Sequence, residues 1–307
     1  MKFSMWPSSA LPAAEIVDLA RHAEHTGWDG FWIADHFMPH DGDPGRDTVE
    51  CWSLISALGL AVPRIRLGAL VSGNTYRHPA VLAKAAVTAD HLSGGRVVLG
   101  LGAGWQENEH QAYGIEFFTL KQRLERLDEA SAIIKLLVSN DRSDFTGKHY
   151  TLVDAPFAPK PLGPLPLLIG AAGEKVSMRI AARHADEWNC WATPEVFAHK
   201  TRILDQHCEQ IGREPSEIKR STQAAVLLRD TPDQVRELEE SGPWPRYRIT
   251  GSTAEVVEKL CAYAEAGVHE FIVPILGFGS PGEQEDRLDA FIDAVKSTPE
   301  LNPSAAG

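Results

Sequence analysis

The sequence has little cysteine and no long apolar run. Only four of its 307 residues are cysteines, and no two of them form a C-x-x-C pair. This excludes a disulfide framework and a zinc ribbon, and it favours a reducing compartment. The N-terminus lacks the apolar core of a signal peptide, and no uncharged apolar stretch approaches the ~18 residues that span a bilayer. We therefore expect a cytoplasmic protein with no membrane partner.

Basic residues are also scarce. The chain has 30 Lys and Arg against 42 Asp and Glu, a net charge of −12, and no block of basic residues. A nucleic-acid site needs a clustered cationic face, so nucleic acid is excluded as a partner. The length allows two domains, or one α/β barrel with insertions.

Short apolar runs alternate with longer amphipathic stretches eight times, which is typical of repeated βα units and a parallel sheet. The first helix shows the usual punctuation, with Pro12 at its start and Gly27 at its end. No dinucleotide fingerprint follows the first strand, so an α/β fold of the (β/α)8 TIM-barrel type is favoured over a doubly wound sheet. The expected strands are Lys2–Trp6, Trp28–Ala34, Ile65–Ser72, Arg96–Leu101, Pro166–Ala171, Glu187–Trp191, Arg220–Leu228 and His269–Ile275. The further expected helices are Pro79–Leu92, Leu120–Val138, Lys175–Arg183, Pro194–Ile211, Thr253–Ala266 and Gln284–Lys296.

Two stretches interrupt this alternation, residues 140–165 and residues 229–248. Both are polar or rich in proline, and both are too long for simple connectors. Loops of this length are usually lids or substrate walls. We expect one barrel domain over residues 1–307 with irregular insertions at these two places.

In such a barrel the active site lies at the carboxyl ends of the strands. Asp35 and His36 follow the second strand and are the best candidates for proton chemistry, because imidazole titrates near neutral pH and a neighbouring carboxylate can orient it. A partly buried structural histidine is the alternative. Together with His40, Asp41 and Asp43 the pair could also bind a metal, but the first strand offers no His-x-His, so no metal is expected.

Glycines cluster after the fourth and fifth strands. Gly100, Gly102 and Gly104 do not complete a G-x-G-x-x-G motif, because its third glycine falls on Trp105. They either let the backbone approach a flat ligand, with Trp105 as an aromatic wall, or form a tight turn. Residues 170–173 (Gly-Ala-Ala-Gly), with a helix expected near residue 174, predict an anion site that nearby cations reinforce, although small residues there can also serve packing alone. The reinforcing cations are Lys175 and Arg179.

The remaining aromatic and polar residues are expected to be structural. Four tryptophans are assigned to packing, two histidines to the surface of the first helix, and residues 107–110 to a solvated first turn of a helix. These residues are Trp28, Trp32, Trp52, Trp188, His22, His25 and the run Glu107, Asn108, Glu109 and His110.

Three segments resemble the luciferase-like monooxygenase superfamily, in particular its coenzyme F420-dependent oxidoreductase branch. They are WDGFWIADHF from residue 28, IRLGALVSGNTYRHPAVLAKAAVTADHLSGGRVVLGLGAGWQENEHQAYGI from residue 65, and PLLIGAAGEKVSMRIAARHADEWN from residue 166. The resemblance implies a TIM barrel with an insertion, F420 or alternatively FMN bound at the carboxyl face, a homodimer, and a separate reductase that regenerates the reduced cofactor.

The resemblance also assigns roles to single residues. Asp35 and His36 match the pair beside the reactive ring carbon, and Ala69 and Leu70 match a bulge that backs the ring, often through a non-proline cis peptide. The positions near the polar edge of the ring are Ser72 and Asn74, those of the loop beside the ring are Gly102, Ala103, Gly104 and Trp105, and those of the phosphate-contacting loop are Gly170, Ala171, Ala172 and Gly173.

The expected activity is hydride transfer between the deazaflavin C5 and a small organic substrate, with His36 giving or taking a proton. In the sugar-phosphate dehydrogenases of this branch a catalytic glutamate stands where this chain has Trp105, so that activity is not expected, and Glu107 and Glu109 are expected to point elsewhere. The alternatives are an FMN-dependent two-component monooxygenase with flavin hydroperoxide chemistry, a non-catalytic flavin-binding protein and a metal-dependent hydrolase.

Overall fold

The computed structural model describes residues 1–39, 43–242, 244–276, 278 and 281–302. Eight parallel strands form a closed barrel in the order β3-β2-β1-β13-β10-β9-β8-β5, and pairing between β3 and β5 closes it. This confirms the expected TIM barrel. The strands are β1 (Lys2–Trp6), β2 (Gly30–Ile33), β3 (Arg66–Ala69), β5 (Val97–Gly102), β8 (Leu167–Gly170), β9 (Glu187–Trp191), β10 (Lys219–Gln223) and β13 (Glu270–Pro274).

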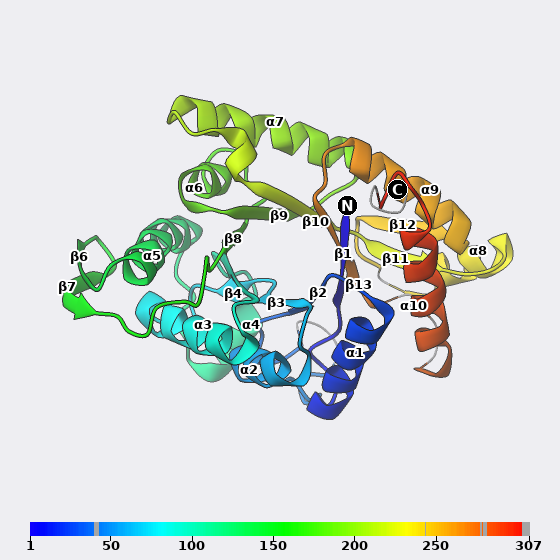
Figure 1. The fold of residues 1–307 in the computed structure, drawn as a ribbon, viewed down its shortest axis with the longest axis horizontal. Helices are drawn as coiled ribbons and strands as arrows, with labels where there is room; N and C mark the ends of the chain where they lie inside the picture. The colour runs from blue at the N-terminus through cyan, green and yellow to red at the C-terminus, as the bar shows by residue number, and fades with distance from the viewer. Residues whose placement is uncertain (40–42, 243, 277, 279–280, 303–307) are drawn as a thin grey trace.

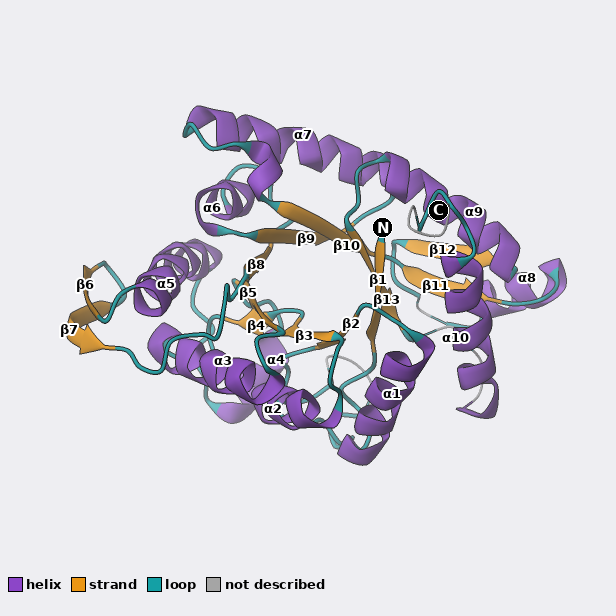
Figure 2. Cartoon of the chain, in the orientation of Figure 1, coloured by secondary structure: helices purple, strands orange, loops and turns teal. Residues whose placement is uncertain are grey.

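The helices surround the strands on the outside of the barrel (Figures 1 and 2). Helix α1 ends as its sequence predicts, because Gly27 adopts a left-handed conformation with φ 83° and donates its N–H to the Ala23 carbonyl. No helix in the described part of the chain is long and apolar enough to cross a membrane. The helices are α1 (Ala13–Thr26), α2 (Cys51–Ala61), α3 (Pro79–Ser93), α4 (Glu107–Tyr113), α5 (Leu120–Ser139), α6 (Ser177–His184), α7 (Pro194–Gln210), α8 (Pro232–Glu240), α9 (Thr253–Glu265) and α10 (Pro281–Lys296).

The third barrel strand is interrupted where one continuous strand was expected. After β3 the chain passes through a cis peptide bond between Leu70 and Val71, and a short strand, β4 (Ser72–Gly73), then continues beside β5. The non-proline cis bond therefore lies one residue later than the expected bulge at Ala69 and Leu70.

Both insertions contain regular elements beside irregular stretches, so they are less irregular than predicted. Residues 140–165 contain an antiparallel hairpin, β6 (Arg142–Thr146) and β7 (Thr151–Pro156), which lies at the edge of the molecule beside α5 (Figure 1). Residues 229–248 contain α8 and lead into β12 (Arg248–Gly251). The expected strand 220–228 is also divided, because β11 (Ala225–Leu228) leaves the barrel and pairs with β12 in a separate two-stranded sheet.

The inside of the barrel is filled by an apolar cluster, against which the partly buried Trp6 and Val71 pack. At the other end, where the strands begin, Arg66 binds Glu187 at 2.6 Å and Glu270 at 2.5 Å, so that end is closed by buried ion pairs. The cluster consists of Trp32, Leu70, Val98, Leu168 and Ile272. All four tryptophans assigned to packing are buried, as predicted; they are Trp28, Trp32, Trp52 and Trp188.

Candidate active site

The floor of the candidate site is a glycine-lined cradle around Val71, the residue that follows the cis bond. A β-carbon on Gly102 would lie 2.7 Å from Cγ2 of Val71, and one on Gly170 would lie 3.1 Å from the same atom. At Gly100 a β-carbon would lie 1.9 Å from the carbonyl oxygen of Ala69. These glycines are therefore required because the backbone and Val71 occupy the space of a side chain.

Replacing Gly100 by alanine is expected to lower the free energy of unfolding by about 1–3 kcal/mol, the usual cost of overpacking, since the clashing atom belongs to the backbone. Urea denaturation measures this. Gly163→Ala is the matched control, because a β-carbon at Gly163 meets nothing within 4 Å. Equal stability of the two variants would contradict the predicted clash.

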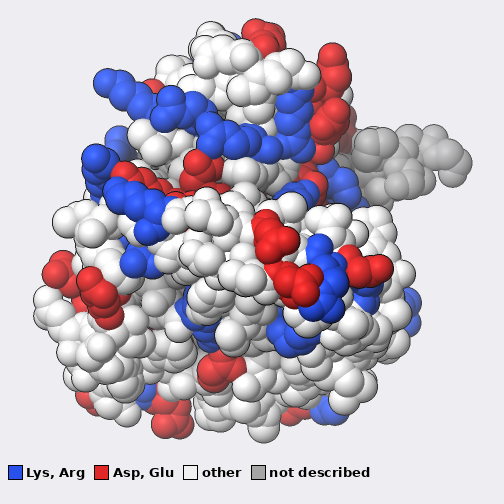
Figure 3. Space-filling model, turned by 90° about the vertical axis from the view of Figure 1, so that its left-hand side faces the viewer, with Lys and Arg blue, Asp and Glu red and all other residues white. Residues whose placement is uncertain are grey.

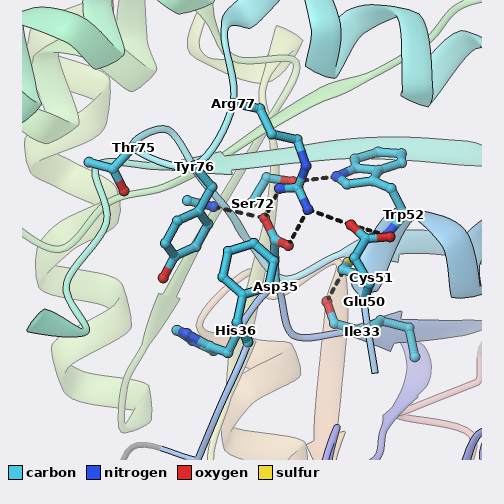
Figure 4. Close-up of polar contacts among 12 residues, drawn as sticks. Ile33, Asp35, His36, Glu50, Cys51, Trp52, Ser72, Thr75, Tyr76 and Arg77 are labelled. Atoms are coloured by element: carbon cyan, nitrogen blue, oxygen red, sulfur yellow. Dashed lines mark hydrogen bonds and ion pairs between the residues drawn. The ribbon is translucent and has the colours of Figure 1, made fainter. Parts of the chain in front are cut away.

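Asp35 does not orient His36 through its carboxylate. Its oxygens accept hydrogen bonds from the guanidinium of Arg77 at 2.6 and 3.0 Å and from the N–H of Gly73 at 3.2 Å. Figure 4 shows the carboxylate turned towards Arg77, which also reaches Glu50, while the His36 ring points the other way. Burial raises the pKa of Asp35, and Arg77 offsets this only in part. Asp35 therefore joins the segments after β2 and β4.

The carboxylate partner of His36 is Glu109, which the sequence did not predict. Nδ1 of His36 lies 2.7 Å from Oε1 of Glu109, although Glu109 was expected to point elsewhere. The expectation of a solvated turn at residues 107–110 is also wrong, because the side chains of Glu109 and His110 are buried. Glu109 is buried because α4 turns it inward towards the backbone N–H of Phe37, 2.7 Å away.

Three buried polar atoms at the carboxyl ends of strands lack a hydrogen-bond partner within the described residues. They are Oδ1 of Asn74, Oε1 of Gln223 and Nε1 of Trp6. Buried polar atoms are normally paired, so these point to a ligand with both donors and acceptors. A flavin or deazaflavin ring has carbonyl oxygens and a ring N–H, which fit this set. Ser72 is not among these atoms, because its buried hydroxyl accepts from the Trp52 indole at 3.0 Å (Figure 4).

Gly102 ends β5, and residues 103–105 begin the loop after it. Ala103 and Gly104 are partly buried, and Gly104 has a φ of 83°, which favours glycine. The Trp105 side chain is 59% exposed, and its ring lies edge-on to His36 at 5.4 Å between centroids. Trp105 therefore forms a wall of the site beside the imidazole.

Gly170 ends β8 and residues 171–173 follow it, but the expected helix start near residue 174 is wrong, because α6 begins at Ser177. The Ala171 N–H donates to the carbonyl of Asn189, and the Gly173 N–H donates to the hydroxyl of Ser177. Two of the amides expected to bind an anion thus have acceptors within the chain. A cation that the sequence did not predict lies beside this loop, because Nζ of Lys200 donates to the Ala172 carbonyl at 2.7 Å.

The considered metal group cannot be assembled from the described residues. His40 and Asp41 lie outside them, and the carboxylate of Asp43 accepts from the N–H of Gly45 on an exposed turn. Among the described residues no group of three or more His, Cys, Asp or Glu side chains could hold a metal.

A closed parallel barrel whose polar groups gather at the carboxyl ends of its strands defines the class of TIM-barrel proteins with a site built from βα loops. The family model for luciferase-like monooxygenases matches residues 1–243. The chain therefore belongs to the luciferase-like monooxygenase family.

Three similar proteins illustrate this membership. An F420-dependent glucose-6-phosphate dehydrogenase from Amycolatopsis mediterranei (strain U-32) is 28% identical over 292 residues, which cover 91% of this chain and 85% of that protein. Another, from Rhodococcus jostii (strain RHA1), is 31% identical over 243 residues, which cover 77% and 71% of the two chains. The structure of an F420-dependent secondary alcohol dehydrogenase in complex with an F420-acetone adduct matches with a TM-score of 0.85 at 18% identity, over 98% of each chain.

Proposed function

We propose that the protein is an F420-dependent oxidoreductase that transfers a hydride between C5 of the deazaflavin ring and a carbon of a small organic substrate. The observation that carries this proposal is the partly exposed imidazole of His36, held by Glu109 at the same end of the barrel as the glycine-lined cradle. The F420-dependent relatives at 28% and 31% identity support this choice of cofactor.

The residues that would hold the cofactor come from several strands. Ala69, Leu70 and Val71 would back the ring, and Asn74 would meet its polar edge together with Gln223 and Trp6. When bound, F420 supplies the carbon that gives or accepts the hydride. His36 would hold the proton that the substrate loses or gains. The loops that would flank the ring and the phosphate are Gly102, Ala103, Gly104 and Trp105, and Gly170, Ala171, Ala172 and Gly173.

The anionic part of F420 needs local positive charge, because the chain carries a net charge of −12. Figure 3 shows Lys and Arg side chains in a band across the upper part of one face, at the height of α6 and α7 in Figure 1. Lys200 lies on α7 beside the loop 170–173, and Arg179 is exposed on α6. We propose that Lys200 and the loop 170–173 receive the phosphate end of the cofactor.

Trp105 favours an uncharged substrate over a sugar phosphate. It presents an exposed indole beside His36, and an aromatic wall packs against apolar or flat groups rather than hydroxyls and phosphate. A small carbonyl compound, alcohol, imine or alkene fits beside this indole better than a sugar phosphate does. Where the protein consumes reduced F420, we propose that a separate reductase regenerates it.

The test is a titration of the purified apoprotein with F420 and, separately, with FMN, followed by tryptophan fluorescence. F420 is expected to quench the emission and FMN to do so weakly. The F420 complex is then mixed with a panel of alcohols, carbonyls, imines and alkenes while the F420 absorbance is recorded. Tight FMN binding with none for F420 would instead favour the two-component monooxygenase, and a bound cofactor that no substrate reduces or reoxidises would favour a binding protein.

We also propose that two copies of the chain pair through α2 and α3. Helix α2 (Cys51–Ala61) contains no charged residue, and its Leu60 side chain is 72% exposed. On the neighbouring α3, Val81 is 59% exposed and lines a groove of about 650 Å³ between the two helices. Large exposed apolar side chains on neighbouring helices indicate an interaction surface, and a second copy presents the same surface to it.

Leu60→Glu combined with Val81→Glu is expected to convert the dimer into a monomer, because each copy would bring two charges into the apolar part of the interface. Size-exclusion chromatography with light scattering should give twice the 33.6 kDa chain mass for the natural sequence and a single chain mass for the variant. Val153→Glu, at a 79% exposed position on β7, is the control that should remain dimeric. A monomeric natural protein would refute the interface.

A further inference from the structure

Glu109 is a buried acid at the site to which hydride transfer itself assigns no task. Its side chain is fully buried, and its two oxygens receive three donors from two different segments. His36 and the Tyr76 hydroxyl both reach Oε1, and the backbone N–H of Phe37 reaches Oε2 at 2.7 Å. Hydrogen bonds to an ionised carboxylate are short and strong, so these three donors and Glu109 fix one another's positions.

The donors determine the charge of Glu109. Burial by itself would raise the pKa of its carboxyl, but the hydrogen bonds from His36, Tyr76 and the Phe37 N–H hold it below its usual range. Burial and the bond to Glu109 raise the pKa of Tyr76 far above its usual range, so the phenol keeps its proton and donates it. Glu109 is therefore ionised at neutral pH, and an ionised carboxylate only accepts hydrogen bonds.

It follows that Nδ1 of His36 is the donor in the 2.7 Å contact. We propose that Glu109 is a positioning residue that fixes the neutral His36 ring as the Nδ1–H tautomer, which leaves Nε2 as the atom that accepts the substrate proton. This inference rests on the proposed role of His36 in hydride transfer. In the direction of alcohol oxidation, bound F420 would supply the acceptor for the hydride of the C–H bond, and Nε2 would take the hydroxyl proton as the carbonyl forms.

A glutamine cannot replace Glu109 in this arrangement. If its oxygen faced His36 and Tyr76, its amide would face the N–H of Phe37, and two donors would oppose each other. If it turned over, the amide would face Nδ1, which would then have to act as an acceptor, so the proton would move to Nε2. Only the second orientation leaves no two donors opposed, because the amide oxygen then accepts from the Phe37 N–H. Glutamine is therefore expected to reverse the tautomer of His36.

Nitrogen-15 spectra of the histidine rings test this directly, because they separate a protonated from an unprotonated ring nitrogen. The full chain is labelled at histidine and measured without cofactor over a series of pH values, so that the singly protonated ring is observed. The His36 signals are identified by their loss in His36→Asn. The natural protein should show a proton on Nδ1. Glu109→Gln should show a mixture or the Nε2–H form, and Glu107→Gln, an exposed acid two residues earlier on α4, should match the natural protein.

Activity provides the second readout. With a substrate found in the F420 panel, Glu109→Gln is expected to lower kcat by about 10- to 100-fold, the range for groups that orient another functional side chain, with little change in KM. Glu107→Gln should keep full activity. Adding Glu109→Gln to His36→Asn should cause no further loss, because Glu109 acts only through the imidazole.

The outcomes separate the two proposals. An Nε2–H tautomer in the natural protein, or an unchanged tautomer in Glu109→Gln, overturns the positioning role whatever the activity. A changed tautomer with unchanged turnover also overturns it, since the orientation then has no catalytic consequence. No F420 turnover in the natural protein refutes the proposed function, and the ring spectra still decide the tautomer. Circular dichroism checks that the variants fold. If Glu109→Gln does not fold, Glu109→Asp replaces it; this variant keeps the charge on a shorter side chain, and its kcat should be intermediate.

Discussion

His36→Asn is expected to lower kcat with F420 by about 10²- to 10⁴-fold, the usual contribution of a positioned acid or base. The asparagine amide can take the place of Nδ1 and still donate to Glu109, while the variant has no atom at the place of Nε2. The loss should therefore fall on proton transfer rather than on the arrangement of the site. Stopped-flow recording of F420 absorbance measures it.

The matched control for this variant is His25→Asn, which changes an exposed histidine on α1. It should leave kcat unchanged, and the affinity of His36→Asn for F420 should equal that of the natural protein by fluorescence titration. A His36→Asn variant with full turnover and an unaltered pH profile would remove His36 from the mechanism.

Arg77→Met is expected to lower the free energy of unfolding by about 3–5 kcal/mol, because it leaves the Asp35 carboxylate buried without its cation. The Asp35 side chain has no exposed surface, and Arg77 binds both of its oxygens. Guanidinium denaturation measures the loss. Adding Asp35→Asn should recover part of it, whereas Arg21→Met, in an exposed ion pair with Asp18, should change stability by no more than about 0.5 kcal/mol.

The pH dependence of Arg77→Met follows from the raised pKa of Asp35. A group whose pKa is higher in the folded than in the unfolded state favours folding at low pH, and this contribution is lost as the pH rises through the folded value. Without Arg77 the pKa of Asp35 should rise further. The deficit of the variant should thus be greatest near neutral pH and shrink as the solution is acidified; a deficit independent of pH would contradict this.

The barrel was predictable because its units repeat a local pattern. Each expected strand overlaps an observed one, and β1 and β9 match to the residue. The break at Leu70–Val71 and the departure of β11 were not predictable, since an apolar run carries no mark of where its partner strand changes. Helix α2 was missed because its apolar residues run on without a helical period, although Glu50 caps its N-terminus.

The candidate site was predictable only in its position along the chain. His36, Asn74 and the glycines follow strands, so the barrel brings them to one end. Their partners were not readable, because Glu109 lies 73 residues from His36 and meets it only through the fold. Tyr76 and Arg77 lie in the NTYRHP segment, directly after a strand. Their polar groups need partners when they are buried, and this need was the available sign that acids lie nearby.

The contacts of Glu109 also determine how this site can be changed. The carboxylate comes from the segment after β5, whereas its donors come from the segments after β2 and β4. TIM barrels are treated as scaffolds with eight exchangeable loops, but here three of the eight form one unit of exchange. A chimaera that takes only the segment after β5 from a relative without an acid at this position leaves three donors facing an empty place, so these segments must be transplanted together.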